Sequence, residues 1–399
     1  MNGVAVFHRD HATFLAAVAT AWGAEEPVFL GNPHWGPEEL AEAMRLIPQG
    51  TTVVGMELTP MGPAPAGWPA NWRGRTMIPT GGTGGRVKFA VHDPASLAAA
   101  VRTLVDFLSA RGLGPTLHGA TLTPPWHVSG LMPFVRAALT GGRHVTLDGR
   151  FPAEGRLPSV DLPTDGTHIA SLVPAQLMRL LARPEGEAWL RRFKVVLLGG
   201  SAVPPACLRE IRDRRLPVYL TYGMTETAAA CVLCPPERLW KNQPPRGTPL
   251  PGVRLGLDGD LLTIATPALA VGLWPTEHFP SAGLRTQDRA EIAADGTVRI
   301  LGRADEVIVT GGEKVDPARV VAALASVATV QVLGLPDQAW GERVVALVVG
   351  EPSLEPALRL AAERLEPAAR PKAYAFVTEL PTDARGKFDR AAARAAFRA

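Results

Sequence analysis

Short runs of β-branched residues alternate with segments of helical periodicity over the first two-thirds of the chain. The best-marked helix follows a capping residue, Asp93, and a helix-starting proline, Pro94, and its apolar residues recur every three or four positions up to Gly112. The strands that we expect on both sides of it lie at 51–58, 119–123, 144–147, 168–173, 194–198 and 218–222. Because strands separated by helices usually pair in parallel and are covered by those helices, the pattern predicts an α/β fold.

The sequence changes character after residue 240. Segments rich in proline and glycine separate short strands expected at 261–265 and 297–301, as in a small antiparallel sheet. A compact α+β unit then follows, with a helix capped by Asp316. Its expected strands lie at 306–310, 329–335 and 343–349. Because 399 residues exceed the usual size of one domain, we expect two. The first, 1–302, would combine parallel or mixed sheets layered with helices and a small antiparallel sheet, and the second, 303–399, would be a small α+β domain.

Charge and cysteine content argue against several classes of protein. A net charge of +3 is too balanced to indicate a nucleic acid or an anionic membrane as partner. Three cysteines cannot form a disulfide framework and are typical of a reducing compartment. Cys231 and Cys234 lack the further ligands of a zinc site, which favours two small buried residues. Charged residues at 8–10 and prolines within the apolar stretch 261–276 argue against a signal peptide and a membrane span, so we expect a soluble cytoplasmic protein without stable membrane insertion.

A glycine-rich segment at 79–88 reads P-T-G-G-T-G-G-R-V-K. Successive glycines let backbone N–H groups turn toward an anion, and threonine hydroxyls and a lysine add donors. The spacing matches neither the Walker A loop nor the dinucleotide fingerprint. Taken alone, the segment is as consistent with an ordinary turn as with a phosphate-binding loop. Its candidate ligand-binding residues are Thr80, Gly81, Gly82, Thr83, Gly84, Gly85 and Lys88.

A second candidate segment, T-Y-G-M-T-E-T at 221–227, follows an expected parallel strand. Ligands of open α/β sheets bind at this end of the strands. The Glu226 carboxylate suits Mg²⁺, which takes carboxylate and phosphate oxygens, and the Thr225 hydroxyl is able to donate to a phosphate. The alternative is the start of a helix capped by Thr225 or Thr227.

Charged residues in three later segments complete the pattern. Asp288, in R-T-Q-D, is able to accept hydrogen bonds from both hydroxyls of a ribose, and Arg303 is able to reach a ribose or phosphate oxygen. Lys387 lies in a basic turn at 383–390. Only six of the 41 basic residues are lysines, and a compact ammonium suits a transient phosphate contact. Taken singly, such residues are usually partners in surface ion pairs.

Together and in this order, the segments closely resemble the motifs of the adenylate-forming superfamily, which includes acyl-CoA synthetases, firefly luciferases and peptide-synthetase adenylation domains. The family patterns are T-S-G-T-T-G-x-P-K, Y-G-x-T-E, R-T-G-D, G-R-x-D-D with a later G-G-E, and a final G-K, and their counterparts here span 76–390. The chain departs from them at Gly81 for Ser, Gly84 for Thr, Val87 for Pro, Gln287 for Gly and Glu306 for Asp. None of these changes removes a charge that the chemistry needs.

The resemblance implies an enzyme that uses ATP, Mg²⁺ and coenzyme A and forms an acyl-adenylate from a small carboxylic acid. The glycine-rich segment would wrap the β- and γ-phosphates, Thr225 would contact the α-phosphate, and Glu226 would bind Mg²⁺. Asp288 would hold the ribose, and Lys387 would bridge the α-phosphate and the acid. The adenine would lie between two segments, composed of Gly199, Gly200, Ser201 and Ala202 and of Thr221, Tyr222 and Gly223.

The resemblance also implies transfer of the acyl group to the thiol of coenzyme A. In the family the small, mobile C-terminal domain rotates about a hinge that maps to Asp305. The rotation would withdraw Lys387 and bring Gly311 and Gly312 to the site, while Arg303 stays near the ribose. A homodimer is a further expectation from the family.

The segment W-H-V-S-G-L-M at 126–132 corresponds to the family segment that lines the acyl pocket. The residue sequences of this segment and of the glycine-rich segment together resemble those of the o-succinylbenzoate–CoA ligases of menaquinone and phylloquinone synthesis. Because that acid has two carboxylates, we expect His127, Ser129 or Arg136 to meet the second one; packing of His127 in the core is the alternative. Other functions that fit are another aryl- or fatty-acid–CoA ligase, a carrier-loading adenylation enzyme, or a nucleotide-binding regulator without turnover.

Overall fold

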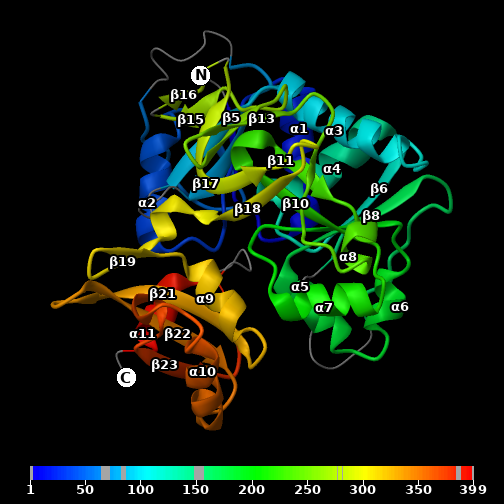
Figure 1. Ribbon diagram of the computed structural model, residues 1–399. Coiled ribbons are helices and arrows are strands. Elements are labelled where there is room, and N and C mark those ends of the chain that lie inside the picture. Colours follow the sequence, from blue (N-terminus) through cyan, green and yellow to red (C-terminus); the bar gives the residue numbers. More distant parts are fainter. Residues whose placement is uncertain are drawn as a thin grey trace.

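The computed structural model describes residues 3–63, 72–81, 87–147, 157–275, 277–280, 282–382 and 388–397. Four β-sheets and their helices make up this part of the chain, which has the α/β fold that the sequence predicts. Figure 1 shows the fourth sheet and its helices, coloured orange to red, lying together beneath the other three. Over the same residues no helix is both long enough and apolar enough to cross a membrane.

The first sheet has the strand order β16-β15-β5-β4-β2-β1-β3. Its strands are β1 (Val4–Val6), β2 (Val28–Leu30), β3 (Thr52–Val54), β4 (Thr76–Gly81), β5 (Val87–His92), β15 (Gly272–Trp274) and β16 (Glu277–His278). The first four pair in parallel, and β5, β15 and β16 pair antiparallel. The strand expected at 51–58 is wrong beyond Val54, because Gly55 takes a φ of 94° and lies so close to Phe7 that a Cβ would be 2.7 Å from its carbonyl oxygen.

The second sheet has the order β12-β11-β10-β9-β8-β6-β7. Its strands are β6 (Leu117–Thr121), β7 (His144–Thr146), β8 (Thr167–Leu172), β9 (Val195–Leu198), β10 (Val218–Met224), β11 (Ala229–Cys234) and β12 (Thr248–Pro249). The strands from β7 to β10 pair in parallel, and β11 and β12 add an antiparallel edge, so the sheet is mixed. Cys231 and Cys234 of β11 are free and buried, which confirms that they are core residues.

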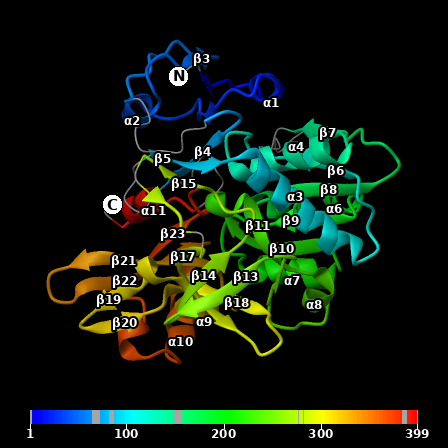
Figure 2. The same ribbon diagram turned by 90° about the horizontal axis from the view of Figure 1, so that it is seen from above.

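Helices cover both faces of the second sheet (Figure 2). Val195 and Leu197 of β9 pack with residues of α3, whereas Val196 and Leu198 pack with residues of α5 to α7, as expected when successive side chains of a strand alternate between faces. Asp93 caps α3 by accepting from the Ser96 N–H at 2.7 Å. The helices of this part are α1 (His11–Gly23), α2 (Pro37–Leu46), α3 (Pro94–Ser109), α4 (Val128–Thr140), α5 (Pro174–Leu181), α6 (Gly186–Leu190), α7 (Pro205–Asp213) and α8 (Pro236–Trp240).

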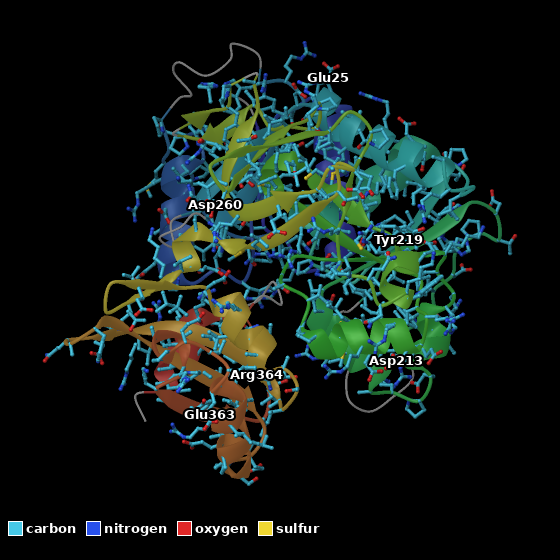
Figure 3. All side chains as sticks on the ribbon, viewed as in Figure 1. Glu25, Asp213, Tyr219, Asp260, Glu363 and Arg364 are labelled. Carbon is cyan, nitrogen blue, oxygen red and sulfur yellow. The ribbon has the colours of Figure 1, made fainter. Side chains whose placement is uncertain are left out.

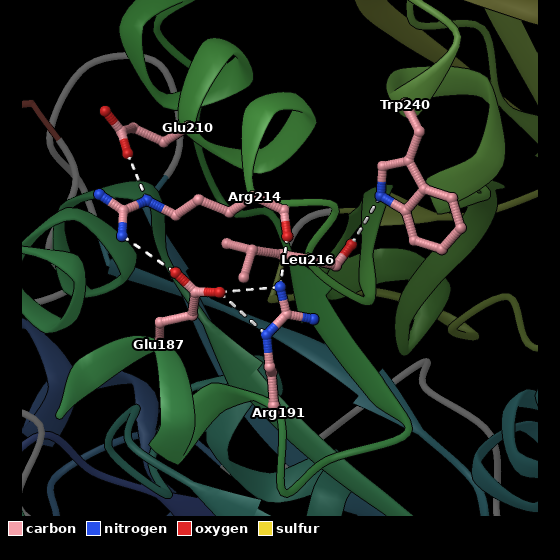
Figure 4. Close-up of polar contacts among 6 residues, drawn as sticks. All are labelled: Glu187, Arg191, Glu210, Arg214, Leu216 and Trp240. Atoms are coloured by element: carbon pink, nitrogen blue, oxygen red, sulfur yellow. Dashed lines mark hydrogen bonds and ion pairs between the residues drawn. The ribbon is translucent and has the colours of Figure 1, made fainter.

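A network of charged side chains fixes the segment that leads into β10. Glu187 of α6 accepts hydrogen bonds from Arg191 at 2.8 Å and from Arg214 at 3.1 Å, and Arg214 also pairs with Glu210 of α7 at 2.7 Å (Figure 4). Arg191 in addition donates to the carbonyl oxygen of Arg214. Because these groups are partly exposed, the network orients the chain more than it stabilises the fold.

The third sheet is antiparallel, with strands β13 (Arg254–Asp258), β14 (Leu261–Ala265), β17 (Leu284–Ile292) and β18 (Val298–Arg303). The fourth contains β19 (Ile308–Thr310), β20 (Glu313–Val315), β21 (Thr329–Asp337), β22 (Gly341–Val349) and β23 (Ala373–Val377). The strand expected at 306–310 starts only at Ile308, because the 3-10 turn η2 (Ala304–Glu306) precedes it. Around this sheet lie α9 (Pro317–Leu324), η3 (Pro352–Leu354), α10 (Glu355–Ala362), η4 (Pro367–Ala369) and α11 (Arg390–Ala395). The division into domains 1–302 and 303–399 stays a prediction.

Ion pairs join the fourth sheet and its helices to the rest of the chain. Arg289 of β17 lies 3.4 Å from Asp316, the residue that caps α9, and also pairs with Asp260 at 2.6 Å. Arg179 of α5 lies 3.8 Å from Glu379, which follows β23. Because the side chains in both contacts are partly exposed, these ion pairs are weak and leave the two parts free to separate.

Candidate functional site

The carboxyl ends of the parallel strands carry most of the candidate residues. Thr80 and Gly81 end β4, and Thr80 pairs with Lys88 of β5, so the two ends of the glycine-rich segment lie on neighbouring antiparallel strands. Four candidate residues of the glycine-rich segment and the lysine near the C-terminus lie outside the described residues; they are Gly82, Thr83, Gly84, Gly85 and Lys387.

The segment after β10 forms a single 3-10 turn, η1 (Thr225–Thr227). The alternative of a capped helix start is met in part, since this one turn begins at Thr225 and the Thr227 hydroxyl bonds the Met224 N–H at its start. The turn continues no further, because Ala228 and Ala229 take positive φ angles of 49° and 78° and reverse the chain into β11. Gly223 lies beside this reversal, and a Cβ on it would be 1.8 Å from the carbonyl oxygen of Ala229. The close approach requires glycine at this position of the Y-G-x-T-E pattern.

Hydrogen bonds from three directions hold this turn. The Thr227 hydroxyl donates to the Ala229 carbonyl at 2.8 Å and accepts from the Met224 N–H at 3.1 Å. The Ala270 N–H, on the segment before β15, donates to the Glu226 carbonyl at 2.8 Å. Thr225 and Glu226 are half-buried at the end of β10, where both side chains border the carboxyl edge of the sheet.

The segment after β9 lies against β10. A Cβ on Gly199 would be 2.0 Å from the Thr221 hydroxyl oxygen, and that hydroxyl donates to the Leu198 carbonyl at 3.3 Å. Gly200 takes a φ of 85° as the chain turns toward α7. The segments 199–202 and 221–223 are therefore neighbours, as the sequence predicts.

The buried Asp288 carboxylate contacts two other predicted site residues, Tyr222 and Arg303. One oxygen accepts a hydrogen bond from the Tyr222 hydroxyl at 2.6 Å, and the other lies 3.6 Å from Nη1 of Arg303. Burial, and then the neighbouring carboxylate, raises the pKa of Tyr222, so its hydroxyl remains a donor. The structure thus brings together the residues expected at the adenine and at the ribose.

The expected hinge residue is bonded to the same arginine. Arg303 donates from Nε and Nη2 to the two carboxylate oxygens of Asp305, both at 2.8 Å. These hydrogen bonds raise the pKa of Arg303 and lower the pKa of Asp305. Beside them, Glu306 pairs with Arg390 of α11 at 2.8 Å.

Gly311 and Gly312 form the turn between β19 and β20, with φ angles of 59° and 84°. The Gly311 N–H donates to the Trp340 carbonyl at 2.8 Å. The described contacts of this turn therefore lie within the fourth sheet rather than beside Asp288.

The predicted acyl-pocket residues lie on or beside α4. His127 immediately precedes the helix, and its carbonyl accepts from the N–H groups of Gly130 and Leu131 at 2.9 Å. Ser129 is half-buried in the first turn. The ring of His127 packs edge-on against Trp126, with centroids 6.3 Å apart.

Two histidines from the N-terminal segment, His11 and His34, contact the same tryptophan, and the sequence motifs did not predict these contacts. The rings of His11 and His34 lie 5.3 and 5.6 Å from Trp126, centroid to centroid. His34 follows the carboxyl end of β2, so its position after a strand was a usable signal, whereas nothing marked His11 of α1. Trp126 is 2% exposed, and its indole N–H has no hydrogen-bond partner among the described residues.

Arg136 is a buried cation on the same helix. Its residue is 6% exposed, burial lowers its pKa to about 10, and its Nε has no hydrogen-bond partner in the described part of the chain. Burying a charge is costly unless hydrogen bonds or an opposite charge compensate it. Arg136 therefore favours a negatively charged group as its neighbour in the functional state.

The acidic residues fit magnesium better than a metal held by protein ligands alone. Among the described residues, no group of three or more His, Cys, Asp or Glu side chains is placed to hold an ion. Mg²⁺ usually takes one or two carboxylates and completes its shell with phosphate oxygens and water. Glu226, half-buried at a strand end, fits that requirement.

Two family models match the sequence. The model described as AMP-binding enzyme matches residues 32–261, and the model described as AMP-binding enzyme C-terminal domain matches residues 319–387. The probable 2-succinylbenzoate–CoA ligase of Mycobacterium tuberculosis strain H37Rv is 34% identical over 337 residues, which cover 79% of this chain and 82% of that protein. The 2-succinylbenzoate–CoA ligase of Bacillus licheniformis is 30% identical over 342 residues, covering 79% of this chain and 68% of that protein.

A solved structure has the same fold. The o-succinylbenzoate CoA synthetase from Bacillus subtilis, in complex with its acyl-adenylate intermediate, matches with a TM-score of 0.74 at 22% identity, covering 97% of this chain and 87% of that chain. Because two family models match and relatives are 34% and 30% identical over 79% of its length, the chain belongs to the AMP-binding enzymes, the adenylate-forming family that its motifs resemble.

Proposed function

We propose that the protein is an AMP-forming acid–CoA ligase that converts o-succinylbenzoate to o-succinylbenzoyl-CoA in menaquinone synthesis. The family and the names of its relatives support the reaction type. The observation that carries the choice of acid is Arg136, a buried guanidinium on the helix that follows the predicted acyl-pocket residue His127. We place the reaction in the cytoplasm, where thiols stay reduced, in keeping with the three free cysteines.

The first half-reaction joins the acid to AMP. A carboxylate oxygen attacks the α-phosphorus of ATP, the bond to the bridging oxygen breaks, and pyrophosphate leaves. Asp288, fixed by Tyr222 and Arg303, would accept the ribose hydroxyls, and Thr225 would donate to the α-phosphate. Lys88, at the base of the glycine-rich hairpin, would face the β- and γ-phosphates. Mg²⁺, held by Glu226 and phosphate oxygens, would neutralise part of the charge on the triphosphate.

Arg136 distinguishes a dicarboxylic acid from a simple aryl or fatty acid. One carboxylate of o-succinylbenzoate reacts, and the second needs a cation if it is to be buried. A pocket for benzoate or a fatty acid has no need of a buried arginine, whose desolvation would be uncompensated. Trp126, just before the same helix, has a buried indole N–H without a partner among the described residues, and Ser129 adds a hydroxyl in the first turn.

The second half-reaction passes the acyl group to coenzyme A. The thiolate attacks the acyl carbon and AMP leaves as the anion. We propose that 303–399 rotates as a domain about Asp305, which exchanges Lys387 for the Gly311–Gly312 turn at the site. The Arg303–Asp305 hydrogen bonds lie at this pivot. A homodimer stays a prediction.

Pyrophosphate exchange into ATP tests the reaction and the acid together. The exchange is measured with o-succinylbenzoate, benzoate and a medium-chain fatty acid. We expect the first acid to stimulate exchange most strongly, and Arg136→Met to raise its KM by roughly 10- to 100-fold while leaving KM for ATP unchanged, because the variant loses a charge-assisted contact. Exchange with benzoate, in contrast, should not fall in Arg136→Met.

A Lys387→Ala variant is the control for turnover. We expect its exchange to collapse while ATP still binds, since the lysine would act on the reacting α-phosphate and the acid. No stimulation by o-succinylbenzoate in the wild type would discard that acid, and unchanged exchange in Lys387→Ala would discard the mechanism.

A further inference from the structure

His92 is a buried histidine to which the mechanism above gives no role. It ends β5, four residues after Lys88 on the same strand, and its exposed fraction is 0%. The strand therefore leads from the glycine-rich segment at one end to this imidazole at the other.

Both ring nitrogens of His92 have partners in separate elements. Nε2 lies 2.8 Å from the Thr225 carbonyl oxygen, and Nδ1 lies 3.1 Å from the Ser96 hydroxyl on α3. A carbonyl can only accept, so Nε2 carries the hydrogen and donates to Thr225, which leaves Nδ1 as an acceptor. The Ser96 hydroxyl beside Nδ1 also donates to the Asp93 carbonyl at 2.9 Å, so its one hydrogen has two acceptors within reach. Burial lowers the pKa of His92 to about 4, which keeps the ring neutral and this arrangement fixed.

The turn that receives this hydrogen bond needs support. Ala228 and Ala229 follow it with positive φ angles, a conformation that costs non-glycine residues free energy. The Ala270 N–H holds the turn at Glu226 from one side, and His92 holds it at Thr225 from the other. The imidazole thus connects the strand behind the phosphate-binding segment to the turn that carries the expected α-phosphate and Mg²⁺ residues.

We propose that His92 is a positioning residue for adenylate formation, which sets the Thr225–Glu226 turn relative to the glycine-rich hairpin by donating to the Thr225 carbonyl. The proposal rests on the proposed function, since it assigns His92 to the first half-reaction. It predicts a loss of kcat and of Mg²⁺ response rather than a loss of nucleotide affinity, because the nucleotide still meets Asp288 and Tyr222.

The experiment compares His92→Ala with His92→Gln in pyrophosphate exchange, using the acid that stimulates the wild type. A glutamine amide can place a donor near the position of Nε2, whereas alanine cannot. We expect His92→Ala to lower kcat by roughly 10- to 100-fold and to raise the Mg²⁺ concentration for half-maximal rate, with KM for ATP nearly unchanged. His92→Gln should recover most of the kcat.

Thr76→Val is the matched control. Thr76 pairs with His92 across the sheet, is equally buried, and uses its hydroxyl to accept a hydrogen bond from the Trp22 indole at 2.9 Å rather than to bond the turn. We expect Thr76→Val to lose stability without the loss of kcat. Should His92→Ala fail to fold, His92→Leu serves in its place, because leucine fills a similar volume without a hydrogen-bond donor for the Thr225 carbonyl.

Equal kinetics in His92→Ala and Thr76→Val, or no recovery in His92→Gln, would overturn the proposal. If none of the acids supports pyrophosphate exchange by the wild type, the proposed function fails instead. His92 is then tested by calorimetry of ATP binding with and without Mg²⁺. We expect His92→Ala to reduce the increase in ATP affinity that Mg²⁺ gives and to leave the affinity without Mg²⁺ unchanged. An increase equal to that of the wild type would overturn the proposal.

Discussion

At Asp288 a single carboxylate is held by a phenol on one side and a guanidinium on the other. Both partners present hydrogens to the carboxylate, so it keeps a fixed rotamer before any ligand arrives. Such preorganisation lowers the entropy that nucleotide binding must overcome. The remaining lone pairs of the two oxygens are the ones available to ribose hydroxyls.

Substitution of Asp288 should therefore act on ATP affinity more than on the chemical step. We expect Asp288→Asn to raise KM for ATP by roughly 10-fold or more, because a neutral amide loses charge-assisted hydrogen bonds of about 1.5–3 kcal/mol. Asp260→Asn is the control: Asp260, labelled in Figure 3, pairs with Arg289 outside the site. Steady-state kinetics at saturating acid give KM for ATP in both variants. Equal KM values for Asp288→Asn and Asp260→Asn would contradict the assignment of Asp288 to the ribose.

Some site residues could be predicted from the sequence and others could not. Tyr222 and Asp288 lie in motifs whose residue types and order are informative, and the structure places them in contact. His92 is a single histidine whose partner, Thr225, lies 133 residues away along the chain. Neither composition nor periodicity encodes a contact of that separation; only the packing of β5 against η1 creates it.

Among the elements, α11 is a short helix that begins just after the segment containing Lys387. With six residues it cannot be stable alone, so its end cap and its packing hold it in place. The Asp389 side chain accepts from the N–H groups of Ala391 and Ala392 at 2.9 and 3.0 Å, and the buried Ala393 packs on the fourth sheet. The segment that contains Lys387 ends just before this cap.

Removing the cap should loosen α11 locally. We expect Asp389→Ala to cost about 1 kcal/mol, which is roughly a fivefold faster hydrogen exchange at the amides of α11, and to slow pyrophosphate exchange by a similar factor. Asp389→Asn keeps a side-chain acceptor and should remain close to wild type. Unchanged protection of the Ala393 amide in Asp389→Ala would show that packing alone holds the helix.

Element boundaries were predictable where a local residue sets them. The helix after Asp93 and the strand at 261–265 follow the expectation, because a capping side chain and a change of periodicity are local signals. The strand at 51–58 ends early, because Gly55 takes a positive φ angle where the chain passes close to Phe7, and the turn at 225–227 stops at Ala228, which also takes a positive φ angle. Tertiary contacts of this kind override local propensity.

Over the whole molecule, buried neutral histidines make stability depend on pH. His144, at the start of β7, lies 2.8 Å from the Thr121 hydroxyl, and burial lowers its pKa to about 4, below the usual 6.5. The unfolded chain then binds a proton that the folded chain does not, so unfolding becomes easier as pH falls from 6.5 to 4. Above pH 6.5 this contribution is fully present.

A His144→Gln variant should make the unfolding free energy less sensitive to acid. We expect the wild type to lose at most about 3 kcal/mol through this group, and the variant to take up as much as one proton less on unfolding near pH 5. Urea titrations at pH 7 and pH 5 measure both. Parallel curves for the two proteins at the two pH values would mean that His144 is protonated in the folded state.

The contact between Arg289 and Asp316 has a consequence for recombination among related enzymes. Strand β17 carries Asp288, which we propose accepts the ribose hydroxyls, and its very next residue, Arg289, pairs with Asp316 of the lobe formed by the fourth sheet and its helices. A chimaera that joins the first three sheets of one parent to the lobe of another would meet this seam at Arg289, not only at Asp305. A chimaera that takes both Arg289 and Asp316 from the same parent keeps this ion pair, so the segment to be swapped includes the end of β17 as well as the C-terminal lobe.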